Sequence, residues 1–141
     1  MTLFDFEIPS SVKIRAIALN CGMYEFSLDA GGKGREKFTQ DLYRMYVGAK
    51  DEKTLQRLDV LGHITGDYPP SFVMTSYYDF LRPNAEPMHN FLKKKGIDSQ
   101  FKCYGKEGQE YMEHVCHVNM NLKEAKKINQ EEVEFFKRYM K

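Results

Sequence analysis

The chain has 141 residues, of which 42% are hydrophobic and 29% are charged, and its formal net charge is +1. This length fits one domain that can bury a core, and the composition is ordinary for a globular protein. A net charge so close to zero gives no electrostatic basis for binding nucleic acid or an anionic membrane.

The sequence shows none of the usual marks of a membrane-spanning or secreted protein. No apolar run is long enough for a transmembrane helix, and residues 1–11 lack the apolar core of a signal peptide. The cysteines are odd in number and have no C-x-x-C spacing; they are Cys21, Cys103 and Cys116. This pattern argues against a disulfide framework or a zinc site and for a reducing compartment. We therefore expect a cytoplasmic protein with no metal and no cofactor.

The first predicted element is a strand over residues 12–19, which ends at the turn signal Asn20-Cys21-Gly22. Its apolar, β-branched content is typical of a strand buried on both faces inside a parallel sheet. Helical spacing follows over residues 38–46, and a second short helix capped by Asp51 is expected around residues 55–58. Residues 61–70 are predicted to form a loop.

The rest of the chain alternates strands and helices, predicted as a strand over 71–76, a helix over 84–95, a strand over 99–104, a loop over 105–121 and a helix over 122–139. Pro87 is placed in the first turn of its helix, where a missing N–H is tolerated. In the strand over 99–104 apolar and polar residues alternate, which predicts one wet face and a place near the sheet edge. The alternation predicts an α/β fold with a parallel sheet of about three strands and flanking helices in three layers.

Candidate functional groups fall at the carboxyl ends of the predicted strands, where parallel sheets gather their sites. Asp79 follows the strand over 71–76, and His114 and His117 lie in the loop after the next strand. A carboxylate placed there can hydrogen-bond an imidazole N–H, fix its tautomer and stabilise the imidazolium, as in hydrolytic triads. The alternative for Asp79 is a structural one, in which it caps the next helix or closes a turn.

The other candidates are better explained without catalysis. Cys21 follows the first strand, but a small buried hydrophobe is the default role for such a cysteine. His63 and His89 are expected to be surface residues, because neither falls at a carboxyl end of a predicted strand.

The segment Pro69-Pro-Ser-Phe-Val-Met-Thr-Ser-Tyr-Tyr-Asp79-Phe-Leu-Arg82 resembles a signature of α/β-hydrolase esterases and lipases. In particular it is similar to the hormone-sensitive-lipase-like carboxylesterases, with two prolines, an apolar strand, a small residue and x-x-Asp-x-Leu-Arg. Later stretches resemble the family's helix, last strand and histidine segment; they are residues 90–96, 101–104 and 114–117. Glu124-Ala125 and Phe135-Phe136 resemble its closing helix. The resemblance implies that Asp79 is the triad acid and His114 the base, with His117 as the alternative. It also implies one partial domain over residues 1–141 with a helical cap-like insertion over 24–67.

The nucleophile of that family is missing from this sequence. No serine lies in Gly-x-Ser-x-Gly, the turn that exposes the nucleophilic hydroxyl, and there is no His-Gly-Gly oxyanion motif. Both belong to the N-terminal half of such enzymes, so the resemblance covers only their C-terminal half. We expect part of a carboxylic-ester hydrolase that is inactive alone, because its base has no nucleophile to activate. An acyl ester is then the substrate of the complete enzyme only.

Two other functions remain open. The chain could be an assembly module that forms a homo-oligomer or a complex with a separate N-terminal half, because the first strand would keep an open edge. Cys21 could instead be the nucleophile, since a thiolate beside a histidine can attack an ester. It does not, however, follow a strand-turn-helix elbow.

Overall fold

The computed structural model describes residues 9, 11–24 and 59–140, together with the single positions Asp41, Met45, Lys53 and Arg57. The chain divides into two compact units, Met1–Ser11 with Tyr24–Ile64 and Val12–Met23 with Thr65–Lys141. Among the helices that these described residues form, none combines the length and the apolar character needed to cross a lipid bilayer.

The first unit contains a short helix where the sequence predicted only a loop. Helix α3 spans Val60–His63, and the Asp59 side chain caps it by accepting a hydrogen bond from Gly62 N at 3.1 Å. That bond satisfies an amide that the start of a helix leaves without a partner. The four single positions are helical. Most of the predicted helices over 38–46 and 55–58, and of the predicted cap over 24–67, lies outside the described residues.

The second unit is built on a three-stranded parallel sheet with the strand order β1-β2-β3. Strand β1 spans Ile17–Asn20, β2 spans Ser71–Ser76 and β3 spans Ser99–Tyr104. Every residue of β2 is buried, as expected for a central strand covered on both faces. Because the strands run in the same direction, their carboxyl ends meet at one edge of the sheet.

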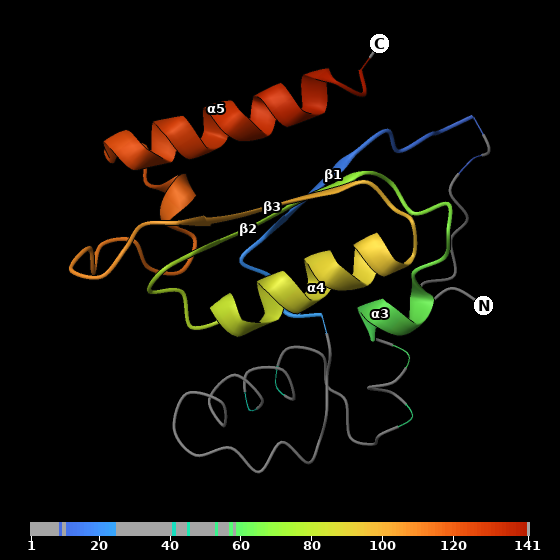
Figure 1. The fold of residues 1–141 in the computed structure, drawn as a ribbon, viewed down its shortest axis with the longest axis horizontal. Coiled ribbons are helices and arrows are strands. Elements are labelled where there is room, and N and C mark those ends of the chain that lie inside the picture. Colours follow the sequence, from blue (N-terminus) through green and yellow to red (C-terminus); the bar gives the residue numbers. More distant parts are fainter. Residues whose placement is uncertain are drawn as a thin grey trace. The chain divides into compact units, whose positions relative to one another are not determined.

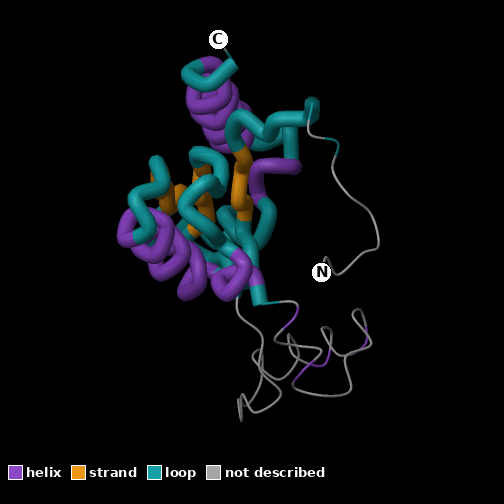
Figure 2. Tube along the Cα trace, turned by 90° about the vertical axis from the view of Figure 1, so that its right-hand side faces the viewer, coloured by secondary structure: helices purple, strands orange, loops and turns teal. Residues whose placement is uncertain are grey.

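Helices cover both faces of this sheet, so the unit has three layers. Helix α4 (Arg82–Lys94) connects β2 to β3 on one face, and α5 (Lys123–Lys137) lies on the other. Figure 1 shows the strands between the two helices, and Figure 2 shows the same arrangement from the side. The short 3₁₀ helix η1 (Cys116–Val118) comes just before α5. The predicted α/β class, parallel sheet and flanking helices are therefore confirmed.

The core between the sheet and α5 contains residues from all parts of the unit, namely Cys21, Phe72, Met74, Met112, Cys116, Ile128 and Phe135. Phe72 of β2 and Phe135 of α5 are both buried, with ring centroids 5.5 Å apart. Burying each large apolar side chain contributes about 1.5–3 kcal/mol, and this holds α5 against the sheet. Because α5 also packs on η1, this core fixes the loop in which His114 lies.

The first strand is shorter than predicted and is not buried on both faces. It begins at Ile17 rather than residue 12, and all four of its residues are half-buried. Val12 and Ile14, which suggested a buried strand, are each 55% exposed. The apolar residues from Ile17 onward do form a strand, but β1 is an outer strand in the described sheet and has β2 as its partner there.

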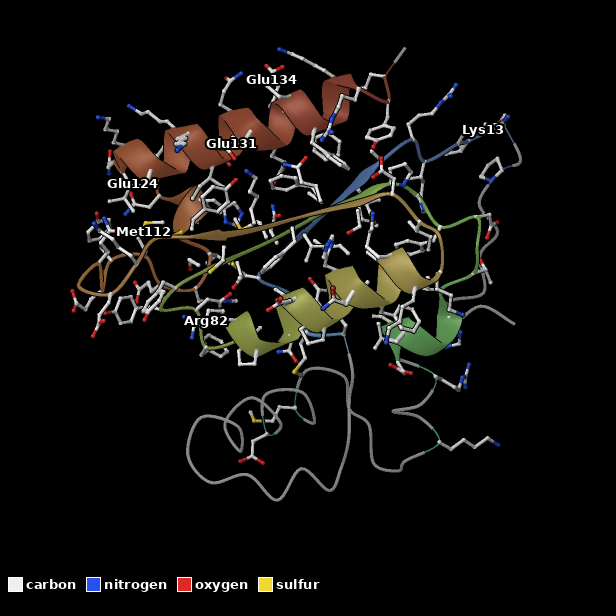
Figure 3. All side chains as sticks on the ribbon, viewed as in Figure 1. Lys13, Arg82, Met112, Glu124, Glu131 and Glu134 are labelled. Atoms are coloured by element: carbon white, nitrogen blue, oxygen red, sulfur yellow. The ribbon has the colours of Figure 1, made fainter. Side chains whose placement is uncertain are left out.

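The face of β3 that was predicted to be wet is covered by α5. Lys102 and Tyr104 reach Glu131 of α5, with Nζ–Oε2 and Oη–Oε2 distances of 3.4 and 2.9 Å. Figure 3 shows Glu131 on the side of α5 that faces the sheet and Glu134 on the opposite side. Cys103, on the predicted apolar face, is exposed instead. The placement of β3 at the edge of the described sheet agrees with the prediction.

Pro87 lies in the interior of α4, not in its first turn, because the helix begins two residues earlier than predicted. The residue that takes the tolerated position near the helix start is Pro83. Pro87 has no N–H to donate, so one carbonyl in the first turn of α4 lacks its usual helical partner.

Candidate active site

Asp79 lies in the turn between β2 and α4, and its side chain is completely buried. One carboxylate oxygen, Oδ2, accepts a hydrogen bond from Thr75 Oγ1 at 2.8 Å. The other, Oδ1, accepts one from Leu81 N at 2.9 Å. The predicted structural role is thus real, because Asp79 closes the turn that leads into α4. These two donors also fix the direction in which the carboxylate points.

His114 meets Asp79 from the loop after β3. Its Nδ1 lies 2.8 Å from Asp79 Oδ1, although the residues are 35 positions apart in the sequence. An ionised carboxylate can only accept, so Nδ1 carries the hydrogen and Nε2 of the neutral ring is left as an acceptor. The His114 side chain is 32% exposed, and the Phe80 ring lies against it at a centroid distance of 4.5 Å.

The loop is held in place on both sides of His114. A bridge pairs Glu113 with Tyr78, and Ser76 Oγ donates to the Glu113 carbonyl at 2.7 Å. On the other side, Val115 has a φ of 53°, a left-handed conformation that is costly for a β-branched residue. The packing of η1 and α5 maintains this conformation, and it turns the chain directly after the imidazole.

The hydrogen bonds keep the buried Asp79 ionised. Burial raises the pKa of the carboxyl group. The hydrogen bonds from Leu81, Thr75, His114 and Cys21 lower this pKa, and together they outweigh the effect of burial. The net result is a pKa below the ordinary value. A buried carboxylate that stays charged beside an imidazole can stabilise that imidazolium when it forms.

The same shift predicts how acid affects stability. Because the folded pKa of Asp79 is lower than the unfolded one, its contribution to stability is complete above about pH 3.9. The contribution should disappear as the pH falls through the folded pKa. We expect the difference in unfolding free energy between the wild type and Asp79→Asn, measured in urea, to shrink below about pH 3.9. A difference that persists unchanged at the lowest pH contradicts this assignment.

Cys21 is the third member of the cluster. It follows β1 directly, is only 3% exposed and belongs to the core, as the structural alternative predicted. Its Sγ also lies within 4.8 Å of ligand atoms of both Asp79 and His114, which the sequence did not indicate. Burial raises the pKa of the thiol to about 12, so the thiolate needed for nucleophilic attack is disfavoured. This weakens the case for Cys21 as a nucleophile.

His117, the alternative base, does not pair with Asp79. It lies in η1, and its Nδ1 is buried with no hydrogen-bond partner among the described residues. Burial lowers the pKa of its imidazole, although nearby Glu132 opposes the shift. Of the two candidate imidazoles, the structure brings only His114 to Asp79.

The other two histidines have different partners. His89 of α4 bonds Ser99 Oγ at 2.9 Å, at the amino end of β3, and stacks on Phe101. His63, at the end of α3, lies 3.0 Å from the Arg57 carbonyl through its Nε2.

The donors that orient Asp79 were not identified from the sequence. Thr75 lies four residues before the carboxylate, on the same face of β2 as Val73, and it appeared only as part of an apolar strand. A hydroxyl four residues before a carboxylate that follows a predicted strand is the sequence signal that could have identified Thr75. The Leu81 amide carries no sequence signal at all, because any residue except proline supplies one.

Three solved esterase structures are similar in fold to most of this chain. Esterase B from Lactobacillus Rhamnosis (HN001) matches with a TM-score of 0.70 and 17% identity, over 89% of this chain and 40% of its own. The C6-C4 SN3 inhibited form of esterase B gives 0.72 and 16%, over 89% and 41%. Esterase E25 gives 0.66 and 18%, over 89% and 40%. At these identities the likeness establishes the fold, consistent with a C-terminal half of an esterase.

This chain spans about two-fifths of the length of the esterases it matches. No model of a known protein family matches the sequence. A comparison with curated proteins also finds no match.

Proposed function

We propose that this chain provides the acid and base of a serine carboxylic-ester hydrolase whose nucleophile lies on another segment. The observation that carries the proposal is the 2.8 Å contact between His114 Nδ1 and the buried, ionised Asp79. The pair lies at the carboxyl ends of parallel strands, on a fold shared with part of known esterases.

In this mechanism His114 works through Nε2. Asp79 holds the Nδ1–H, which leaves Nε2 free to take the proton of a serine hydroxyl as the serine attacks the ester carbonyl. Asp79 stabilises the resulting imidazolium, and His114 then returns the proton to the leaving alcohol. The sequence contains no Gly-x-Ser-x-Gly and no His-Gly-Gly, so the attacking hydroxyl and the oxyanion donors must come from elsewhere. The chain alone therefore hydrolyses no ester.

A fluorophosphonate probe tests this proposal, because it reacts with an activated serine. We expect no stoichiometric labelling of the isolated chain, while a complete serine esterase in the same assay is labelled fully. Stoichiometric labelling of a serine in the isolated chain would disprove the idea that the nucleophile lies outside it.

A companion experiment supplies the missing segment. The chain is co-expressed with the product of the DNA immediately upstream, where a Gly-x-Ser-x-Gly serine is expected to become reactive. Asp79→Asn should then lower kcat by about 10⁴-fold, as loss of the orienting acid does in a triad. His114→Ala should abolish labelling, whereas His117→Ala should preserve it. Labelling that does not depend on His114 contradicts its role as the base.

A second function, assembly, is favoured by the outer edge of β1. The amides of Ile17 and Cys21 donate at 2.9 Å to carbonyls in or just before β2. Backbone groups alternate between the two edges of a strand, so those of Ala18 and Asn20 point away from β2. Among the described residues β1 pairs with β2 only. A second copy of this chain, or a separate N-terminal half, could add a strand there.

Light scattering on the chain and on Ala18→Pro tests the assembly function. Proline removes the outward N–H of Ala18 and leaves the inward bonds of Ile17 and Cys21 in place. We expect the wild type to exceed the monomer mass at high concentration and Ala18→Pro to remain monomeric. Ala18→Val keeps the N–H and should behave like the wild type. A wild type that stays monomeric at every concentration contradicts self-assembly through this edge.

The proposed location is the cytoplasm. All three cysteines are free, which suits a reducing compartment.

A further inference from the structure

Three side chains of different chemistry meet at the carboxyl ends of the strands. The thiol of Cys21, a carboxylate oxygen of Asp79 and a ring nitrogen of His114 all lie within 4.8 Å of one another. They come from the end of β1, the turn after β2 and the loop after β3. The sequence argued against a metal site because its cysteines lack zinc spacing, but the fold gathers these three ligands from distant positions.

The backbone holds the Cys21 thiol toward the cluster in a conformation that a cysteine rarely adopts. Cys21 has a φ of 53°, in the left-handed region, directly after the last residue of β1. Its amide donates to Met74 O at 2.9 Å, so the turn is anchored to β2. A strained non-glycine residue is kept only where the surrounding structure fixes it, and such residues gather at functional sites.

The ligand set matches the chemistry of Zn²⁺. Thiolate, imidazole and carboxylate are its three protein ligand types, and three protein ligands leave a fourth position for water or substrate. The charges also balance, because a thiolate and a carboxylate together neutralise Zn²⁺ beside a neutral imidazole. Coordination removes the thiol proton to solvent, and the imidazole stays neutral by carrying its proton on Nε2.

Hydrogen bonds from outside the cluster already hold the carboxylate in one orientation. Thr75 Oγ1 and Leu81 N hold the two oxygens of Asp79 at 2.8 and 2.9 Å, and neither donor belongs to the ligand set. Supporting hydrogen bonds of this kind fix the direction of metal-ligating carboxylates. The His114 side chain, 32% exposed, gives the cluster its contact with solvent.

We propose that Cys21, Asp79 and His114 form a binding site for Zn²⁺. The ring nitrogen that faces Asp79 cannot bind a metal and donate a hydrogen bond at once. Metal binding therefore breaks the Asp79–His114 bond, and this consequence for catalysis rests on the function proposed above. The binding itself does not depend on that function.

Titration of the full chain with Co²⁺ tests the site, because thiolate–Co²⁺ coordination gives an intense near-ultraviolet absorption. We expect one Co²⁺ per chain, displaced by Zn²⁺. Cys21→Ser should abolish the thiolate band, whereas Cys103→Ser, the same change at an exposed position, should leave it intact. Absence of the band in folded wild-type protein at millimolar Co²⁺, or an equal band in Cys21→Ser, overturns the proposal.

A second variant tests the site independently, in case Cys21→Ser does not fold. His114→Ala removes a partly exposed ligand, and circular dichroism checks that the variant is folded. Its affinity for Zn²⁺ should fall by more than about 10-fold, because losing even a group that only supports a metal ligand costs about 10- to 100-fold. Unchanged affinity in the folded variant removes His114 from the site and overturns the proposal. The assays use no ester, so a negative result leaves the proposed acid–base function standing.

Discussion

Asp79→Ala is expected to lower the free energy of unfolding by about 2–6 kcal/mol, because it leaves two buried donors without an acceptor at a cost of about 1–3 kcal/mol each. The variant leaves the Thr75 hydroxyl and the Leu81 amide without their acceptor, and His114 without its partner. Each buried donor left unsatisfied carries a desolvation cost of its own. Urea denaturation followed by circular dichroism measures the effect.

The matched control is Glu134→Ala, which removes an acidic residue that is paired with Lys137 on the exposed side of α5. This exposed ion pair should contribute nothing measurable to the free energy of unfolding, so the control should unfold at the same urea concentration as the wild type. If Asp79→Ala and Glu134→Ala have the same stability, the Asp79 hydrogen bonds do not hold the turn together.

This prediction affects how mutants of the proposed acid are interpreted. Asp79 closes a turn, joins β2 to α4 and orients His114, so its removal disturbs both fold and chemistry. A loss of activity in Asp79→Ala would not by itself identify a catalytic acid. Asp79→Asn keeps the shape and one of the two acceptor oxygens, which makes it the better test of the acid role.

Phe135→Ala is expected to cost about 3–5 kcal/mol, the typical loss for a buried phenylalanine cut to alanine. The ring is 1% exposed and contacts Phe72 of β2 and Tyr139 beyond the end of α5, at centroid distances of 5.5 and 5.1 Å. Its removal leaves a cavity between α5 and the sheet. Since small domains are stable by only about 5–15 kcal/mol, this one change should bring the chain close to unfolding.

Val133→Ala is the control for Phe135→Ala, because it shortens a side chain of the same helix that is 45% exposed. It should change the unfolding free energy by no more than about 0.5 kcal/mol. Thermal unfolding of both variants compares them directly. Equal melting temperatures would show that α5 is not held by the buried ring.

The outcome for Phe135→Ala also bears on the site. Helix α5 packs on η1, and η1 follows the left-handed Val115 next to His114. A loosened α5 should therefore release the loop that presents the imidazole, although Phe135 is not part of the Asp79–His114 pair. The core and the site are in this sense one structure, because the loop that carries His114 leads directly into η1, and η1 packs on α5.

Local pattern was enough to predict most of the second unit. The apolar run over 71–76, the stripes of the helices predicted over 84–95 and 122–139, and their alternation with strands correctly gave β2, α4, α5 and the parallel sheet. These features are encoded by neighbours in the sequence, through helical and strand periodicity. The same reasoning failed for residues 12–16, because an apolar run cannot reveal whether a partner strand lies beside it.

The sequence by itself determined that Asp79 would follow a buried strand and that two histidines would lie in the loop after β3. It could not choose between His114 and His117, because that choice depends on the turn at Val115 and on the packing of η1 beneath α5. Only the tertiary structure placed His114 Nδ1 against Asp79 and brought the thiol of Cys21 to the same point. The physical reason is that these contacts join residues far apart in the chain, and their geometry is set by burial in a shared core rather than by any local pattern.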